Sequence, residues 1–92
     1  MHTVTVIIPP PLRKYVDGES QVQVKAALMA DLFQGLFAAH PGLDGRLLDD
    51  DGSVRRHLNV FVGGEDIRWQ KGLDTPLIAG DQVTILTALA GG

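Results

Sequence analysis

The chain has 92 residues, which is enough for one domain with a single hydrophobic core. Hydrophobic residues make up 45% of it and charged residues 21%, a composition typical of globular proteins. The sequence has no cysteine, which excludes disulfides, thiolate metal sites, iron–sulfur clusters and a cysteine nucleophile, and its formal net charge of −3 disfavours a nucleic-acid partner.

The start of the chain has no basic segment followed by an apolar one, so no signal peptide is expected. No apolar run approaches the ~20 residues needed to span a bilayer. We therefore expect a cytoplasmic protein without a membrane partner.

The first half of the chain predicts two strands and a helix. Residues 3–8 are almost all β-branched and predict a strand, which the prolines at 9–11 end because proline cannot donate to a sheet ladder. Residues 21–24 alternate like a half-buried strand paired with the first. Residues 27–40 predict a helix, since apolar side chains recur at i, i+4 and Pro41 then stops the pattern. Its core-facing stripe comprises Leu28, Met29, Leu32, Phe33, Leu36 and Phe37.

Two features of this region leave questions open. Ala26 and Ala27 leave the predicted helix without a capping residue, so its start is uncertain. In the irregular segment 43–57, Leu43, Leu47 and Leu48 could form a short helix. The three aspartates at 49–51 do not fit a calcium loop, because the glutamate such a loop requires is missing.

The second half predicts a hairpin and a final strand. Residues 58–62 predict a strand with Leu58, Val60 and Val62 facing inward, and the Gly63–Gly64 pair predicts a tight turn into a short strand at 67–69. Residues 83–86 predict the last strand. This order favours an α+β fold, a mixed sheet of about four to five strands with one main helix across one face.

The chain then divides into a domain at 1–86 and a tail at 87–92. Its last residues, Ala90, Gly91 and Gly92, bury little surface, so folding gives no reason for two glycines there. They would form a thin thread that can enter a narrow enzyme channel. An α-carboxyl with a pKa near ~3.5 is an anion at neutral pH, so a partner must activate it. The alternative is an inert frayed terminus.

Three segments of the chain are characteristic: Val4-Thr5-Val6 leading to Ile8-Pro9 and Leu12-Arg13, Asn59-Val60-Phe61-Val62 with Glu65-Asp66-Ile67-Arg68, and residues 80–86 followed by Ala90-Gly91-Gly92. With the order of elements, they resemble a known family, the ubiquitin-like β-grasp sulfur carriers. These include the small subunit of molybdopterin synthase, the thiamine-pathway sulfur carrier and the actinobacterial cysteine-biosynthesis carrier, which the chain resembles most.

The resemblance implies a carrier that is not itself an enzyme and binds no cofactor. An E1-like enzyme would use ATP to adenylate the Gly92 carboxylate, and sulfur would replace AMP to give a thiocarboxylate. The acceptor would be a cysteine synthase containing pyridoxal phosphate, and a metalloprotease would release the product. Leu89, Ala90 and Gly91 would lie in the partner's channel.

A docking surface is also expected. If Val60 and its neighbours face the helix, Phe61 faces the opposite side of the sheet, and Ile7 and Leu86 share that parity. We expect these three residues to form part of an apolar partner patch, unless the irregular segment at 43–56 covers them. His2, His40 and His57 are far apart in sequence, so surface roles are favoured over a metal site.

Several functions remain open at this stage. The sulfur acceptor could instead serve molybdopterin, thiamine or a sulfur-containing natural product. A ubiquitin-like modifier would also use Gly92, but would join it to lysines of target proteins. A β-grasp interaction module with an inert tail is the third possibility.

Overall fold

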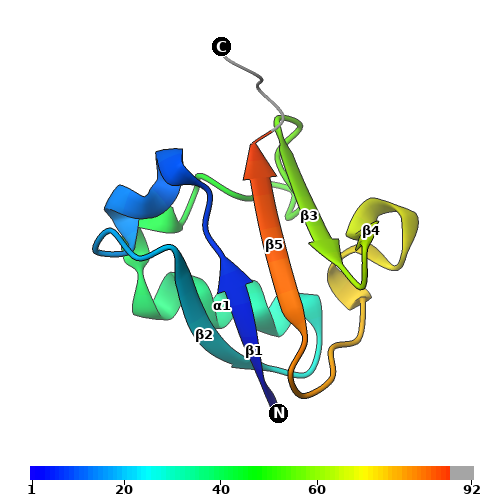
Figure 1. The fold of residues 1–92 in the computed structure, drawn as a ribbon. Helices are drawn as coiled ribbons and strands as arrows, with labels where there is room; N and C mark the ends of the chain where they lie inside the picture. Colours follow the sequence, from blue (N-terminus) through cyan, green and yellow to red (C-terminus); the bar gives the residue numbers. More distant parts are fainter. Residues whose placement is uncertain (88–92) are drawn as a thin grey trace.

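The structure is a computed structural model that describes residues 1–87. It contains a five-stranded sheet with the strand order β2-β1-β5-β3-β4 and one α-helix packed across one face (Figure 1). The α+β prediction is confirmed. The strands are β1 (His2–Ile7), β2 (Gln21–Ala26), β3 (Leu58–Val62), β4 (Glu65–Asp66) and β5 (Gln82–Thr87), and the helix is α1 (Met29–Ala39).

The sheet is mixed because one pair of neighbouring strands, β1 and β5, runs in parallel. β1 pairs antiparallel with β2 and parallel with β5, and β5 pairs antiparallel with β3. A parallel pair needs a long crossover connection, which α1 and the segments around it supply. The last strand of the chain therefore lies in the middle of the sheet.

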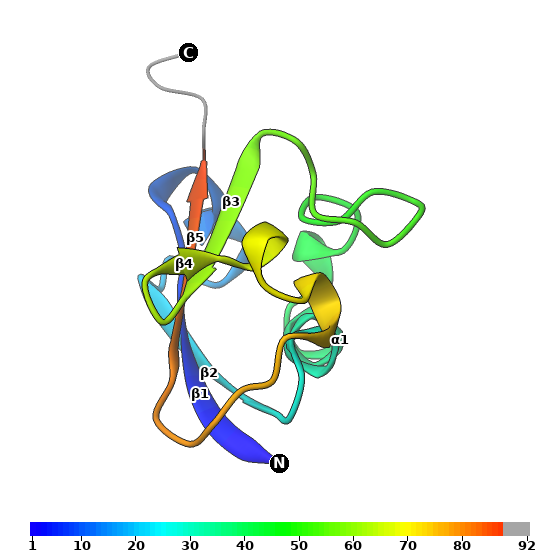
Figure 2. The ribbon, with the colours of Figure 1, turned by 90° about the vertical axis from the view of Figure 1, so that its right-hand side faces the viewer.

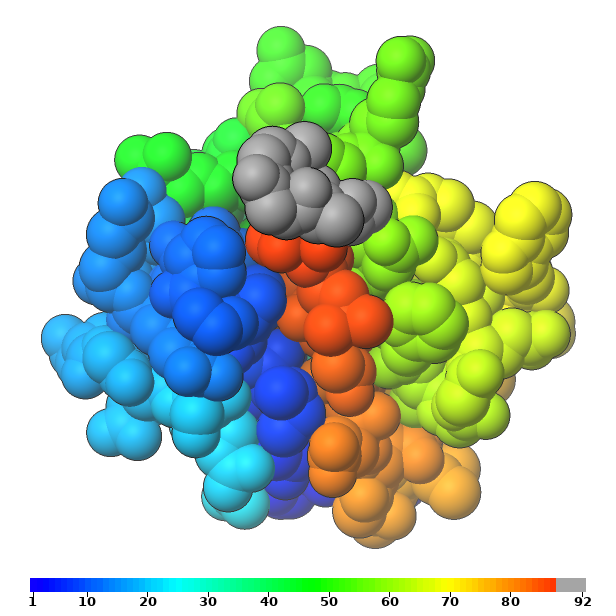
Figure 3. All heavy atoms as spheres, turned by 45° about the horizontal axis from the view of Figure 1, so that its top comes forward, coloured from blue at the N-terminus to red at the C-terminus, as the bar shows by residue number. Residues whose placement is uncertain are grey.

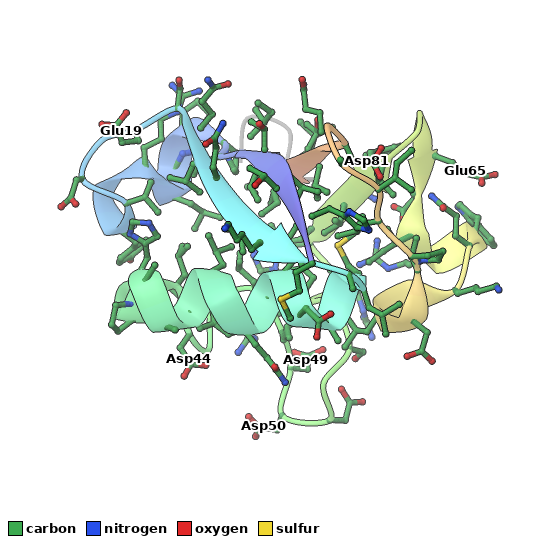
Figure 4. The ribbon with its side chains drawn as sticks, turned by 90° about the horizontal axis from the view of Figure 1, so that it is seen from below. Glu19, Asp44, Asp49, Asp50, Glu65 and Asp81 are labelled. Atoms are coloured by element: carbon green, nitrogen blue, oxygen red, sulfur yellow. The ribbon has the colours of Figure 1, made fainter. Side chains whose placement is uncertain are left out.

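The core fills the space between the sheet and α1, and Figure 4 shows side chains of both layers meeting there. Alternate residues of each central strand are buried, which confirms the inward orientation predicted for Leu58, Val60 and Val62. The helix contributes a matching apolar stripe. The core residues of these elements are Val4, Val6, Val24, Ala26, Met29, Leu32, Phe33, Leu36, Leu58, Val60, Val62, Val83 and Ile85.

The helix begins at Met29, two residues later than predicted, because its cap comes from inside the first turn. The side chain of Asp31 accepts hydrogen bonds from the backbone nitrogens of Leu28 (2.9 Å) and Ala27 (3.2 Å). These bonds satisfy donors that a helix start leaves without intrahelical partners. A carboxylate in the first turn also complements the positive end of the helix dipole.

The irregular segment between α1 and β3 lies on the helix side of the sheet (Figure 2). It contains a 3₁₀ helix, η2 (Pro41–Leu43), but no regular helix over the three leucines. Leu43 and Leu47 are buried, whereas Leu48 forms an isolated bridge with Val54. The segment therefore extends the core on this side of the sheet.

The predicted hairpin is present, but its second strand is shorter and earlier than expected. Gly63 and Gly64 have φ of 65° and 80°, the left-handed conformation that a two-residue turn of this kind needs. The prediction of a strand at 67–69 is wrong. Asp66 accepts a hydrogen bond from the nitrogen of Arg68 and caps a 3₁₀ helix, η3 (Ile67–Trp69), which turns Ile67 into the core.

Two other 3₁₀ helices complete the fold, η1 (Pro10–Tyr15) after β1 and η4 (Gly72–Asp74) before β5. Within residues 1–87, no helix has both the length and the apolar character needed to cross a membrane.

Candidate functional site

The end of β5 positions the C-terminal tail. Thr87 is the last described residue and pairs with Leu58 at the start of β3. Since β5 lies between β1 and β3, the chain leaves the domain from the centre of the sheet (Figure 1). β5 extends one residue beyond the expected boundary at 86. The predicted channel residues Leu89, Ala90 and Gly91, and the predicted reactive Gly92, lie outside the described residues.

The three residues of the predicted partner patch lie on one face of the sheet, opposite α1. Ile7 and Phe61 both pair with Thr84, so Ile7, Thr84 and Phe61 form one row across β1, β5 and β3. With strands ~4.8 Å apart, Ile7 and Phe61 are about 10 Å from each other. Leu86 lies two residues beyond Thr84 on the same face, toward the tail.

The helix-free face of the sheet is accessible at these positions. The irregular segment that could have covered it packs on the helix side instead (Figure 2). Leu86 is 47% exposed, and Ile7 and Phe61 are half-buried between their strand neighbours. We call Ile7, Phe61 and Leu86 the sheet patch. That a partner binds there stays a prediction.

A polar network borders the sheet patch at the β3–β4 edge. Asp66 pairs with Phe61 across the hairpin and is only 6% exposed. Its carboxylate accepts hydrogen bonds from Asn59 Nδ2 (3.0 Å) and the Arg68 nitrogen (2.8 Å), and lies 3.4 Å from the Arg68 guanidinium. A buried carboxylate is stabilised when it is paired and hydrogen-bonded in this way. The network therefore fixes the edge next to Phe61.

Metal ligation has no visible basis within residues 1–87. In this part of the chain, no three His, Asp or Glu residues lie close enough together to hold an ion. His2 lies at the start of β1, His40 follows α1 and His57 precedes β3, so the structure does not bring the three histidines together.

Two hollows lie outside the sheet patch, and the sequence predicted neither. The larger, about 770 Å³, lies between residues 49–56 and residues 67–73. Asp51 lies at the rim of this hollow. Its carboxylate accepts a hydrogen bond from the Ser53 hydroxyl, which has the larger effect, and one from the Ser53 backbone nitrogen, and both hold the pKa of Asp51 below its usual value. The smaller, about 300 Å³, lies among η1, Gly45, Arg46, Arg55 and His57. Each is formed by segments distant in sequence, so no local motif indicates it.

The mixed five-stranded sheet with one helix across one face is a β-grasp fold. Residues 6–92 match the ThiS family, and the chain belongs to that family. The resemblance to the β-grasp sulfur carriers is therefore confirmed.

Among the curated relatives is the sulfur carrier protein CysO of Mycobacterium tuberculosis. It is 38% identical over 91 residues, which cover 97% of this chain and 98% of the relative. Small archaeal modifier protein 3 of Haloferax volcanii is 38% identical over 66 residues, covering 72% of this chain and 71% of the relative.

Solved structures give the same grouping. A chain of the BexX/CysO complex of Amycolatopsis orientalis has a TM-score of 0.89 and 38% identity, covering 97% of this chain and 99% of that one. SAMP1 of Haloferax volcanii has a TM-score of 0.80 and 28% identity, covering 98% and 99%. Both share the β-grasp fold, and the Amycolatopsis orientalis structure is a complex of two proteins.

Proposed function

We propose that this protein is a sulfur carrier whose Gly92 carboxylate is converted to a thiocarboxylate. The observation that carries the proposal is the similarity to the CysO sulfur carrier over nearly the full length of both chains. The family match also runs through Gly92. In this role the folded domain is a handle that partner enzymes recognise, and it has no catalytic site of its own.

The chemistry needs an activating partner, because a carboxylate is a poor electrophile. A Gly92 oxygen attacks the α-phosphorus of ATP and pyrophosphate leaves, which gives an acyl-adenylate. Hydrosulfide from the sulfide source then adds to the acyl carbon, AMP leaves and a proton is lost, which gives the thiocarboxylate directly. An E1-like enzyme supplies ATP binding and the sulfur transfer.

The domain's contribution is to present this carboxylate at the end of a strand. The five residues after Thr87 span up to about 17 Å when extended, at ~3.4 Å per residue. That length reaches into an enzyme channel while the sheet patch stays at the mouth. Ordering such a thread costs ~1–2 kcal/mol per residue, so binding at the patch and along the channel must offset that cost.

We further propose that the acceptor is a cysteine synthase containing pyridoxal phosphate, with a metalloprotease that releases cysteine from Gly92. Support for this acceptor comes from the likeness to CysO proteins. Acceptors for molybdopterin, thiamine or a sulfur-containing natural product are the alternatives within the same chemistry.

A second candidate function is protein modification. The likeness to small archaeal modifier protein 3 favours it, because that protein is named as a modifier and shares 38% identity over 66 residues. Both functions begin with the same acyl-adenylate, and they differ in whether sulfur or a lysine amine replaces AMP.

Intact-mass measurement after incubation with the host's E1-like enzyme, ATP and a sulfide source tests the proposal. We expect a gain equal to exchange of one oxygen for one sulfur, confined to the C-terminal peptide and absent when Gly92 is deleted. Lysine-linked conjugates without that gain would favour the modifier. If neither the thiocarboxylate nor conjugates formed, while the same enzyme turned over ATP with another carrier, the protein would be an interaction module.

The thread itself gives a second prediction. Gly91→Ala adds one methyl group next to the reacting residue, and we expect unchanged thermal unfolding but slower activation or sulfur transfer. Single-turnover formation of the thiocarboxylate measures this effect. Ala88→Gly, at the base of the tail, is the control. Equal rates for the Gly91→Ala variant and the parent protein would contradict a requirement for a narrow thread.

A further inference from the structure

The smaller hollow is a basic groove at the end of the domain from which the tail leaves. The chain as a whole is acidic, with eleven Asp and Glu residues against eight Lys and Arg. The groove reverses this balance, because it contains three cationic side chains and an imidazole but no carboxylate. Its lining residues are Pro11, Leu12, Lys14, Tyr15, Gly45, Arg46, Arg55 and His57, and we call it the basic groove.

An aromatic ring organises the basic groove. The guanidinium of Arg46 lies 4.3 Å from the centroid of the Tyr15 ring, and the ammonium of Lys14 lies 5.4 Å from it. Both distances are within the range of a cation–π contact. Gly42 packs against the same ring, since a Cβ there would come within 3.0 Å of Tyr15 Cδ1. The two cations therefore share a ring that is itself held in place.

The hydrogen bonds of the groove leave charge available. Arg46 donates a hydrogen bond from Nε to the carbonyl oxygen of Gly42 (2.9 Å), which orients the guanidinium, and within residues 1–87 its two terminal nitrogens form no hydrogen bond. Such a fork suits a carboxylate. Arg55 bonds the carbonyl oxygen of Gly45 and lies 3.4 Å from Asp49. Within residues 1–87, no carboxylate forms a salt bridge with Lys14 or Arg46.

The basic groove adjoins the root of the tail. His57 directly precedes Leu58, which pairs with Thr87 at the end of β5. In Figure 3, η1 (blue) and the segment before β3 (green) lie around the end of β5 (red). Asp44 and Asp50 lie on the side of α1 that faces away from the sheet (Figure 4). A partner that takes up the tail must therefore come close to this positive end.

We propose that the basic groove receives aspartate or glutamate side chains of the enzyme that activates the tail. This proposal rests on the proposed function and adds the chemistry of the partner's surface. The net charge of −3 would repel an acidic partner surface as a whole. The positive groove attracts that surface at one end of the domain and so orients the carrier on the enzyme. The groove's volume, about 300 Å³, suits a few side chains rather than a large ligand.

Charge reversal at the groove tests the proposal with the host's E1-like activating enzyme as the probe. The variants are Arg46→Glu and Lys14→Glu. Within residues 1–87 the Lys14 side chain forms no hydrogen bond, so its replacement breaks none there. Lys25→Glu is the matched control, because Lys25 is exposed on β2 near the opposite end of the sheet and changes the net charge equally. Thermal unfolding of each variant checks that the domain is intact.

We expect both groove variants to associate about three- to tenfold more slowly than Lys25→Glu at low salt, and the difference to disappear at ~1 M salt, where the Debye length is only ~3 Å. At saturating carrier, the rate of thiocarboxylate formation should be unchanged. Groove variants that match Lys25→Glu at low salt would overturn the proposal, even if the parent protein is activated normally. Failure of the parent to be activated would instead count against the proposed function.

Nuclear magnetic resonance with inorganic phosphate separates a small-anion site from a protein contact. We expect only weak shifts around Arg46 that do not saturate. Saturation by phosphate, without a salt-dependent association defect in the groove variants, would overturn the proposal and identify a small-anion site.

Discussion

At the scale of single residues, Gly35 is a position where two layers meet too closely for a larger side chain. It lies in the middle of α1, where glycine costs about 1 kcal/mol relative to alanine. The structure gives the reason for it, because a Cβ at Gly35 would lie 2.8 Å from Val24 Cγ1 on β2. The glycine is thus a packing requirement, although the sequence alone suggests only a weakness of the helix.

We therefore expect Gly35→Ala to destabilise the domain by about 1 kcal/mol, since the strain of overpacking, ~1–3 kcal/mol, exceeds the gain in helix propensity. Urea unfolding measures the change. The control is a double-mutant cycle with Val24→Ala, which removes the atom that clashes. The double variant should be more stable than the sum of the single effects, and strict additivity would contradict the contact.

At the scale of elements, the start of α1 depends on a side chain within the helix. We expect Asp31→Ala to lower the free energy of unfolding by about 1 kcal/mol, because it removes both hydrogen bonds to the backbone nitrogens of Ala27 and Leu28. Asp44→Ala, which removes an exposed carboxylate outside the helix, is the control for net charge. Equal unfolding midpoints for the two variants in urea would show that Asp31 does not cap α1.

The same helix shows which features of the fold a sequence pattern predicts and which it does not. Its apolar stripe, like the alternation in the strands, follows from a local period that the sequence displays directly. The first residue of the helix does not follow from that period. It is set by Asp31, an acid three positions after Leu28, whereas the usual capping residue stands before the helix. The prediction of a strand at 67–69 was wrong for a similar reason, since Asp66 caps a 3₁₀ helix there.

The candidate site divides in the same way. The sheet patch was predictable because residue parity on a strand fixes the face. The basic groove was not, because it combines η1, the segment after η2 and the residues before β3. Only the tertiary fold brings Lys14, Arg46 and His57 together.

At the scale of the whole molecule, two surfaces border the root of the tail. The sheet patch supplies apolar area on the helix-free face, and the basic groove supplies positive charge at the end of the domain. A partner that holds Gly92 in its active site would meet both surfaces in one approach. We expect the apolar surface to govern the lifetime of the complex and the charged one to govern its rate of formation.

Leu86→Asp tests the apolar contribution, because Leu86 is exposed and its replacement leaves the core intact. We expect at least about a tenfold loss in kcat/KM for activation, since an apolar residue at the centre of an interface contributes ~2 kcal/mol or more. Phe61→Asp should act in the same direction, with its folding checked separately. The matched control is Trp69→Asp, because Trp69 is 79% exposed and belongs to η3 on the helix side of the sheet (Figure 2). If Leu86→Asp and Trp69→Asp had equal kcat/KM values, the sheet patch would have no part in recognition, and the partner would have to hold the domain by its tail and its charged end alone.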